Sequence, residues 1–231
     1  IKNKKSVIIE KPITDNAKDA ATIMNLAYKN RVNVRVNHVY LYHPMYRVLK
    51  EIIDDKTKIN SIYSNSGNNG PFRKDISPLW DWGPHDLAMC LDFFGHMPID
   101  IEAKITKGKS SLENNSFNVC AQLNFENNQY AELNFGNMMK RKERHFKLNF
   151  RNSLYIFDPI KYSHIKIENI YNSKKIIKDQ IPKTFNLEKT PLEILIKEFV
   201  EDIKNSRFEI KELKLAKDVV NILEEIERKL R

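Results

Sequence analysis

The apolar residues in the first part of the chain follow two alternating periods. Short β-branched or alternating runs predict strands, and apolar residues spaced three and four apart predict helices. The pattern predicts a buried strand over 6–9, a helix over 17–30, a strand over 32–36 and a helix over 45–53. Strands and helices that alternate in this way are typical of an α/β fold.

Several of these elements carry start and stop signals. Thr14 or Asp15 can cap the first helix, because a side-chain oxygen there accepts from a free backbone N–H. After a further predicted strand over 59–64, the segment 66–71 is rich in glycine, asparagine and proline, which predicts a loop. The next helix ends at Gly95, a residue suited to the left-handed conformation that follows a helix.

From residue 99 onward the pattern changes to successive short strands. Turn signals at 126–128 and 151–153 join neighbouring strands into hairpins, which predicts an antiparallel sheet with one packed and one open face. Two amphipathic helices over 191–205 and 212–230 close the chain. The predicted strands are 99–107, 117–125, 129–135, 146–151 and 153–157, with shorter ones at 165–170 and 175–178.

Length and composition are those of an ordinary globular protein. The chain has 231 residues, of which 41% are apolar and 30% charged. Cys90 and Cys120 are its only cysteines, which argues for a reducing compartment. The sequence shows neither a long apolar span nor a signal peptide. We therefore expect a cytoplasmic protein with no membrane partner. The sequence begins without methionine, close to its first strand, and we expect it to be a piece of a longer chain.

The net charge of +9 raises the question of a nucleic-acid partner. The lysines are scattered along the chain and form no stripe with aromatic residues. The net charge is therefore the one feature in favour of such a partner, and we expect none. The one dense basic cluster, 140–144, is predicted to be a solvated loop, and attraction of anionic substrates is the alternative.

Glu10, Lys11 and Pro12 directly follow the first predicted strand. Ligands of open α/β sheets bind at the carboxyl edge of the strands, where these three residues would lie. The ammonium group of Lys11 would then stand at the mouth of a cleft and could take part in proton transfer. The alternative is that Glu10 and Lys11 are solvated residues at a strand end.

Asp81 and His85 lie four residues apart, with Pro84 between them. If the first turn of a helix includes both, and Pro84 stands at the helix start, the two side chains share one face. The carboxylate would raise the pKa of the imidazole and the helix N-terminus would lower it, so we expect a pKa near neutral. A core histidine satisfied by hydrogen bonds is the alternative.

Taken in order, these segments resemble the Gfo/Idh/MocA oxidoreductases. The resemblance covers positions 6 to 95, and the later strands and helices agree with the family in pattern only. It implies an NAD(P)-dependent dehydrogenase that acts on a sugar, a sugar derivative or a nucleotide sugar. The segments that carry it are 7–13, the helix that follows, 38–44, 79–86 and the helix end at 94–95.

The resemblance also implies roles for individual residues. Lys11 would lie beside the nicotinamide and the reacting hydroxyl, His85 would be the acid/base, and Asp81 would lie beside the substrate. The cofactor-binding segment would be Glu10, Lys11 and Pro12, and no metal is implied. The residues expected to line the substrate cleft are Tyr40, Tyr42, Arg73, Trp80 and Asp86.

The sequence departs from the family pattern in two places. Ala88 stands where many members carry an acidic residue, three positions after the histidine. The Gly-rich strand–turn–helix that holds the pyrophosphate is also missing, because none of the 6 glycines stands in a Gly-x-Gly pattern. NAD or NADP is therefore expected to bind this chain weakly or not at all, and the sequence does not indicate which of the two.

These features predict the C-terminal part of such a dehydrogenase. Residues 1–37 would be the last strand–helix–strand piece of a Rossmann-type domain. Residues 38–231 would form an α/β substrate domain with a large, mostly antiparallel open sheet, like the C-terminal domain of dihydrodipicolinate reductases. By family precedent the open face would form a homo-oligomer, a dimer or tetramer. The alternative is a truncated, non-catalytic homologue that binds a sugar-like ligand or supplies a dimerisation sheet.

Overall fold

The computed structural model describes residues 1–109, 116–160, 165–169, 173–176 and 188–231. Its first elements are β1 (Val7–Ile9), α1 (Ala17–Asn30) and β2 (Val34–Val36). The two strands pair in parallel, with Val7 opposite Val34. The expected strand–helix–strand order is confirmed, but β1 is not buried as predicted, because within the described residues it pairs only with β2 and leaves Ile8 37% exposed.

The helices begin and end close to their predicted limits. Asn16, rather than Thr14 or Asp15, caps α1 by accepting from the backbone N–H of Asp19. Helix α3 ends at Gly95, which adopts the predicted left-handed conformation at φ 82°. The remaining helical elements are η1 (Val39–Tyr42), α2 (Pro44–Ile52), η2 (Lys56–Lys58), α3 (Pro78–Phe94), η3 (Glu126–Asn128), α4 (Pro191–Lys204) and α5 (Lys211–Leu230).

A large sheet forms the second half of the molecule. Among the described residues it has eight strands in the order β10-β9-β8-β7-β3-β6-β5-β4, and every neighbouring pair is antiparallel except β3 with β6. The mostly antiparallel sheet of the sequence prediction is therefore confirmed. Its strands are β3 (Ile59–Asn69), β4 (Asp100–Lys109), β5 (Ser116–Asn124), β6 (Tyr130–Gly136), β7 (Met138–Phe150), β8 (Ser153–Phe157), β9 (Ile165–Asn169) and β10 (Ser173–Ile176). The predicted ends at 170 and 177–178 lie outside the described residues.

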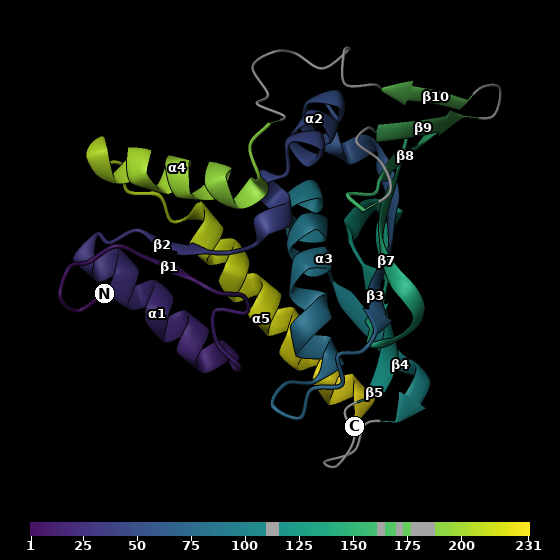
Figure 1. The fold of residues 1–231 in the computed structure, drawn as a ribbon, viewed down its shortest axis with the longest axis horizontal. Helices are drawn as coiled ribbons and strands as arrows, with labels where there is room; N and C mark the ends of the chain where they lie inside the picture. Colours follow the sequence, from purple (N-terminus) through teal and green to yellow (C-terminus); the bar gives the residue numbers. More distant parts are fainter. Residues whose placement is uncertain (110–115, 161–164, 170–172, 177–187) are drawn as a thin grey trace.

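The elements are arranged in layers, seen in Figure 1. Helix α3 packs on the inner face of the sheet against β3, β5 and β6, and α5 packs against α3. Helix α5 also contacts α1 and β2, so the end of the chain covers its beginning. On the opposite face of the sheet Figure 1 shows no helix from the described ranges, which agrees with the predicted open face.

Strand β3 continues five residues beyond its predicted end, so the predicted loop over 66–71 is wrong for 66–69. The strand lies between β6 and β7, and partners on both sides supply the backbone hydrogen bonds that local sequence could not indicate. Gly67 faces Gly136 so closely that a Cβ on Gly67 would lie 2.1 Å from the Gly136 carbonyl oxygen. The glycine that suggests a turn is thus a site of close strand approach.

The basic cluster 140–144 belongs to β7 and is not a loop. Residues 140–142 are exposed, but Arg144 has only 4% of its surface exposed. Arg144 is in phase with the buried positions Phe146, Leu148 and Phe150, because alternate residues of a strand face the same side. The pairing with β3 therefore places a cation on the inner face of the sheet.

Helix α4 buries only part of its apolar stripe. Leu195 and Phe199 are buried, whereas Leu192, Ile196 and Ile203 are each 44–45% exposed. The helix itself is well defined at its start, where Thr190 and Glu193 form a capping box. Within the described residues, no helix is long and apolar enough to cross a membrane.

Candidate active site

The carboxyl ends of β1 and β2 bring two short polar segments side by side. Parallel pairing places Glu10 and Lys11 next to Asn37 and His38, and the Asn37 backbone N–H donates to the Ile9 carbonyl at 2.8 Å. Glu10 is exposed and accepts from the Asn37 side-chain amide at 2.9 Å. The edge where ligands of parallel sheets bind therefore carries the residues that the sequence singled out.

Lys11 is held by Asp81 of helix α3. Its Nζ donates to the backbone carbonyl of Asp81 at 2.5 Å and to Asp81 Oδ1 at 3.1 Å. Only 17% of the Lys11 side chain and 23% of the Asp81 side chain are exposed. The following bond to Pro12 is cis. The ammonium group thus has a fixed position between the strand end and the helix, and Asp81 pairs with this group rather than with His85.

Asp81 and His85 lie one turn apart in α3, as their spacing predicted. The helix begins at Pro78, with the Ser77 hydroxyl as its cap, so Pro84 lies inside the helix and not at its start. The expectation that Pro84 opens the helix is therefore wrong, because Ser77 and Pro78 already supply a cap and a first-turn proline. His85 consequently lies too far from the N-terminus for the dipole argument to hold.

His85 is half-buried, and within the described residues its Nδ1 has no hydrogen-bond partner. Its ring lies edge-on to Tyr40, with centroids 5.0 Å apart, and to His38, with centroids 6.4 Å apart. Burial, followed by the charges of Arg144 and Lys11, holds the pKa of His85 well below 6.5. The expected pKa near neutral is wrong because Asp81 is bound to Lys11 and does not offset the burial.

His38 was not singled out as a site residue from the sequence. It is 3% exposed, and neither ring nitrogen has a partner among the described residues. Burial and the nearby charge of Lys11 lower the pKa of His38 to about 3. The Asn37 Oδ1 atom beside it is also buried without a partner in this part of the chain. Unsatisfied buried polar groups are rare, and the two histidines that carry three of them, His38 and His85, both lie within reach of the charge of Lys11.

Arg144 and Asp86 form a buried ion pair whose cation is close enough to His85 to lower its pKa. Arg144 Nη1 lies 3.5 Å from Asp86 Oδ1, and Ser66 Oγ donates to Asp86 Oδ2. Burial raises the pKa of Asp86, against the opposing effects of Arg144 and Ser66. The guanidinium also lies over the ring of Tyr40, 4.3 Å from its centroid. In the sequence, the signal for burial of Arg144 was its position two residues before the alternating apolar residues that begin at Phe146.

The structure separates two of the predicted substrate residues, Tyr42 and Trp80, from this cluster. Tyr42 is buried elsewhere and donates to Glu212. Arg73 is exposed and paired with Asp75 at 2.6 Å, and the charge of Asp81 adds to the effect of Asp75 in raising the pKa of Arg73. Trp80 is buried, with its indole N–H donating to Glu227 at 3.2 Å. Of the predicted cleft residues, Tyr40 contacts His85 directly, and Asp86 pairs with Arg144, whose guanidinium lies over the ring of Tyr40. No group of three or more potential metal ligands was found in the described part of the chain.

The buried histidines predict an acid-sensitive fold. The pKa values of His38 (about 3), His43 (about 4) and His85 are depressed, so between these values and 6.5 the unfolded chain binds more protons. Stability is therefore present above pH 6.5 and is lost as the pH falls below it, by up to about 2 kcal/mol per histidine at pH 5. Urea unfolding at pH 7 and pH 5 measures this loss.

The His38→Gln variant is the control for this pH dependence. When its unfolding free energy is plotted against pH, the slope should correspond to about one proton fewer taken up on unfolding. Burial raises the pKa values of Asp86 and Glu212, so these two groups favour the folded state as the pH falls. They do so in the wild type and in the variant alike. An unchanged slope in the variant would contradict the assignment to His38.

The fold defines a protein class in which a parallel strand–helix–strand unit is followed by a second half built on a large, mostly antiparallel sheet. The fold matches that of a protein described as an oxidoreductase from Magnetospirillum magnetotacticum, with 24% identity, a TM-score of 0.80 and coverage of 96% of this chain and 72% of that chain. It also matches UDP-N-acetylglucosamine 3-dehydrogenase from Acidithiobacillus ferrooxidans (16%, TM-score 0.82, coverage 97% and 70%). A third match is a 3-ketoreductase from Actinomadura kijaniata in complex with NADP (15%, TM-score 0.79, coverage 98% and 70%).

These likenesses confirm the fold that the resemblance to the Gfo/Idh/MocA oxidoreductases predicted. No family model and no curated protein sequence matches the chain.

Proposed function

We propose that this chain is the C-terminal portion of an NAD(P)-dependent dehydrogenase acting on a sugar, a sugar derivative or a nucleotide sugar. The observation that carries the proposal is the group of unpartnered buried atoms on His38 and His85 around the fixed ammonium group of Lys11. Two structurally similar proteins are a UDP-N-acetylglucosamine 3-dehydrogenase and a 3-ketoreductase with NADP. This likeness in fold supports the class of substrate and cofactor.

The residues fit one end of a nicotinamide cofactor. Glu10, Lys11 and Pro12 would hold the nicotinamide end, since they stand at the carboxyl end of β1 next to buried atoms that lack partners. The Gly-rich turn that would hold the pyrophosphate is absent from the 231 residues. Bound nicotinamide supplies hydride transfer, and the remaining chemistry belongs to the side chains of this chain.

Oxidation of an alcohol requires its oxygen to lose a proton while its carbon loses a hydride. His85 would take this proton, because a depressed pKa keeps its imidazole neutral near pH 7. The ammonium group of Lys11 would stabilise the negative charge that develops on the same oxygen. Asp81 would orient Lys11 through its carboxylate and its backbone carbonyl. In the reverse direction the proton would return from His85 to the carbonyl oxygen.

We further propose the division into residues 1–37, a remnant of the nucleotide-binding domain, and residues 38–231, the substrate and oligomerisation domain. The parallel pair β1–β2 with α1 supports the first unit. The uncovered sheet face supports a homo-oligomer, since a sheet with one open face can pack against a second copy. The competing proposal, a non-catalytic sugar-binding or dimerisation module, draws on the same open face.

A fluorescence titration with NADH and NADPH tests whether the 231 residues lack a binding site for the pyrophosphate. We expect weak or no binding to the 231-residue chain, because hydrogen bonds to the pyrophosphate supply much of the affinity for a dinucleotide. The product of the complete open reading frame should bind one of the two nucleotides and oxidise a nucleotide sugar. Tight binding to the 231-residue chain would contradict the proposed absence of the cradle. A complete product that binds a sugar and transfers no hydride would favour the non-catalytic module.

A further inference from the structure

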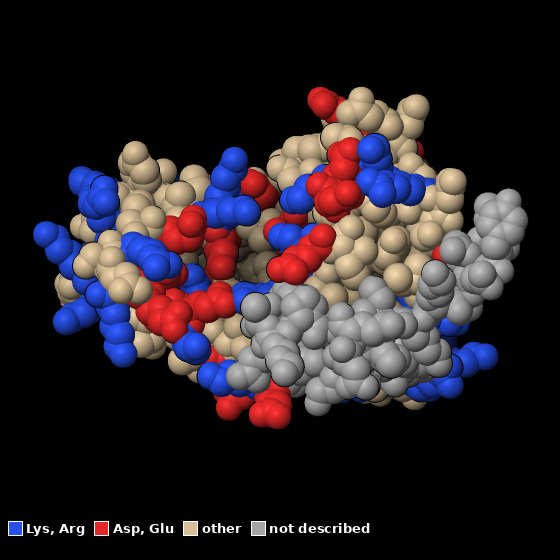
Figure 2. Space-filling model, turned by 90° about the horizontal axis from the view of Figure 1, so that it is seen from above, with Lys and Arg blue, Asp and Glu red and all other residues tan. Residues whose placement is uncertain are grey.

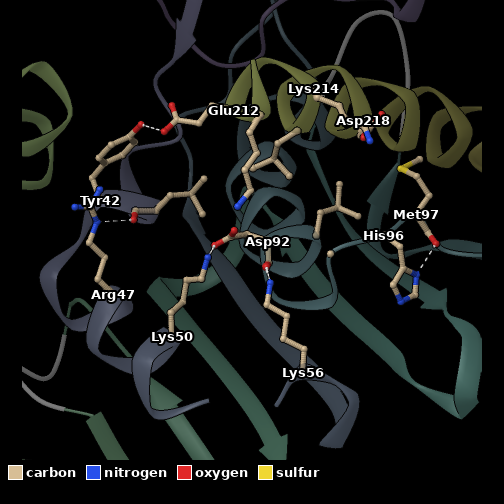
Figure 3. Close-up of a pocket in the computed structure, with 15 residues that line it drawn as sticks. Tyr42, Arg47, Lys50, Lys56, Asp92, His96, Met97, Glu212, Lys214 and Asp218 are labelled. Atoms are coloured by element: carbon tan, nitrogen blue, oxygen red, sulfur yellow. Dashed lines mark hydrogen bonds and ion pairs between the residues drawn. The ribbon is translucent and has the colours of Figure 1, made fainter. Parts of the chain in front are cut away.

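A second cleft lies away from the candidate active site. It has a volume of about 660 Å³ and is formed by η1, α2, the C-terminal end of α3 and the N-terminal end of α5 (Figure 3). Asp92 lies in the cleft and His85 in the active site, seven residues apart on α3, which corresponds to about 10 Å along the helix. Pockets of this size hold small organic ligands.

Cations outnumber acidic groups in this cleft. Its lining includes five cationic side chains and three acidic ones, and one of the cations, Arg47, is paired with Glu198 outside the lining. The cations are Arg47, Lys50, Lys56, Lys211 and Lys214, and the acidic residues are Asp92, Glu212 and Asp218. Figure 2 shows charged side chains of both signs around a hollow on the face seen from above.

The acidic groups of the cleft are already engaged. Glu212 accepts from Tyr42 and lies 3.1 Å from Arg35 Nε. Asp218 lies 3.0 Å from Lys217 Nζ. Asp92 accepts from Lys50 at 2.6 Å and from the Tyr46 hydroxyl at 2.9 Å. These contacts leave little carboxylate charge for the remaining lysines.

Among the residues that the structure describes, Lys56 has no ion pair of its own. Its Nζ donates to the backbone carbonyl of Asp92 at 2.8 Å, while the carboxylate of Asp92 binds Lys50, and Figure 3 shows Lys50 and Lys56 both pointing toward Asp92. Burial, followed by the positive charge of Lys50, lowers the pKa of Lys56, and Lys211 adds to this effect. Three ammonium groups close to one carboxylate repel one another, and a bound anion would relieve that repulsion.

The walls of the cleft suit an organic anion. Apolar side chains are supplied by Leu41, Leu91, Leu215 and Met97. The backbone N–H of Lys211, in the first turn of the 20-residue helix α5, already donates to Glu209 Oε1 at 2.7 Å, so the attraction for an anion comes from the lysine side chains.

We propose that this cleft is a second binding site, which takes an organic phosphate whose phosphate group lies among Lys50, Lys56 and Lys211 and whose apolar part lies against the leucines. A phosphate suits three ammonium groups better than a carboxylate does, because it carries more charge and more acceptor oxygens. Although η1 and α3 contribute to both sites, the residues that line this cleft differ from those around Lys11 and His85, so the site does not depend on the proposed dehydrogenase activity.

Phenyl phosphate is a suitable probe, with inorganic phosphate and benzoate as its partial mimics. NMR or calorimetric titration of the 231-residue chain should show phenyl phosphate binding at least about tenfold more tightly than either mimic, because only it has both parts. The Lys56→Gln/Lys211→Gln variant should lose at least about tenfold in affinity, and Lys56→Arg should retain most of it.

Two matched variants show whether the loss of affinity is specific to the lysines of this cleft. Lys104→Gln removes an exposed lysine on β4 and should leave the affinity unchanged. Lys11→Met removes the ammonium group of the active site and should also leave it unchanged, so failure of the proposed dehydrogenase would not affect this result. Absence of binding, or equal affinity in wild type and the double variant, would overturn the proposal.

Discussion

Exchange of His85 for asparagine is expected to lower kcat of the proposed dehydrogenase about 10²- to 10⁴-fold, the usual contribution of a positioned acid/base. Asparagine preserves polarity and approximate size but cannot accept and return a proton at neutral pH. The Lys11→Met exchange should produce a loss of similar size, because the charge on the reacting oxygen would lose its partner. Both are measured as reduction of NAD(P)⁺ by a nucleotide sugar, with the product of the complete open reading frame.

The double variant tests whether Lys11 and His85 act on one reacting group. If they do, its loss of kcat should be much smaller than the product of the two single losses. Lys104→Met, on an exposed position of β4, is the control for removal of a lysine far from the site. Activity of the His85→Asn variant within about threefold of wild type would remove the proposed acid/base role.

Replacement of Asp86 by leucine is expected to lower the free energy of unfolding by about 3–5 kcal/mol, because it leaves the buried Arg144 guanidinium without a carboxylate. Asp86 is fully buried, and 4% of the Arg144 side chain is exposed, so water cannot replace the lost partner. The exchange also leaves the Ser66 hydroxyl without its acceptor. Equilibrium unfolding in urea at pH 7 measures the loss.

Two further variants separate the buried charge from the loss of a side chain. Asp86→Leu combined with Arg144→Met should recover much of the stability, because no uncompensated charge remains. Asp75→Leu breaks an exposed ion pair with Arg73 and should change stability by less than about 1 kcal/mol. If Asp86→Leu costs no more than Asp75→Leu, the pair with Arg144 does not hold a buried charge in place.

Most helices and strands could be predicted from the chain because their signals are local. Periodicity gave α1, α2, α4 and α5 within a few residues, and Gly95 marked the end of α3, although not its start. The strands of the large sheet also followed from alternation and turn residues. The positions of Lys11 and Asp81 at a strand end and on a helix were predictable for the same reason, together with the order of motifs.

Contacts between distant segments were not predictable. Residues 66–69 extend β3 because β6 and β7 pair with them, and pairing partners leave no local signal. Arg144 is buried because β7 lies with one face against α3, although its neighbours in the sequence are exposed cations. His38 drew no attention as a site residue because burial of its two ring nitrogens depends on elements far along the chain.

The sequence by itself therefore determined the order of strands and helices, the family resemblance and the two residues, Lys11 and His85, that the proposed chemistry needs. Only the tertiary structure decided that Asp81 holds Lys11 and that His85 is neutral near pH 7. It also decided that Tyr42 belongs to a different cleft. The physical reason is that hydrogen bonding and periodicity act between near neighbours, whereas burial and charge depend on every segment that packs around a group.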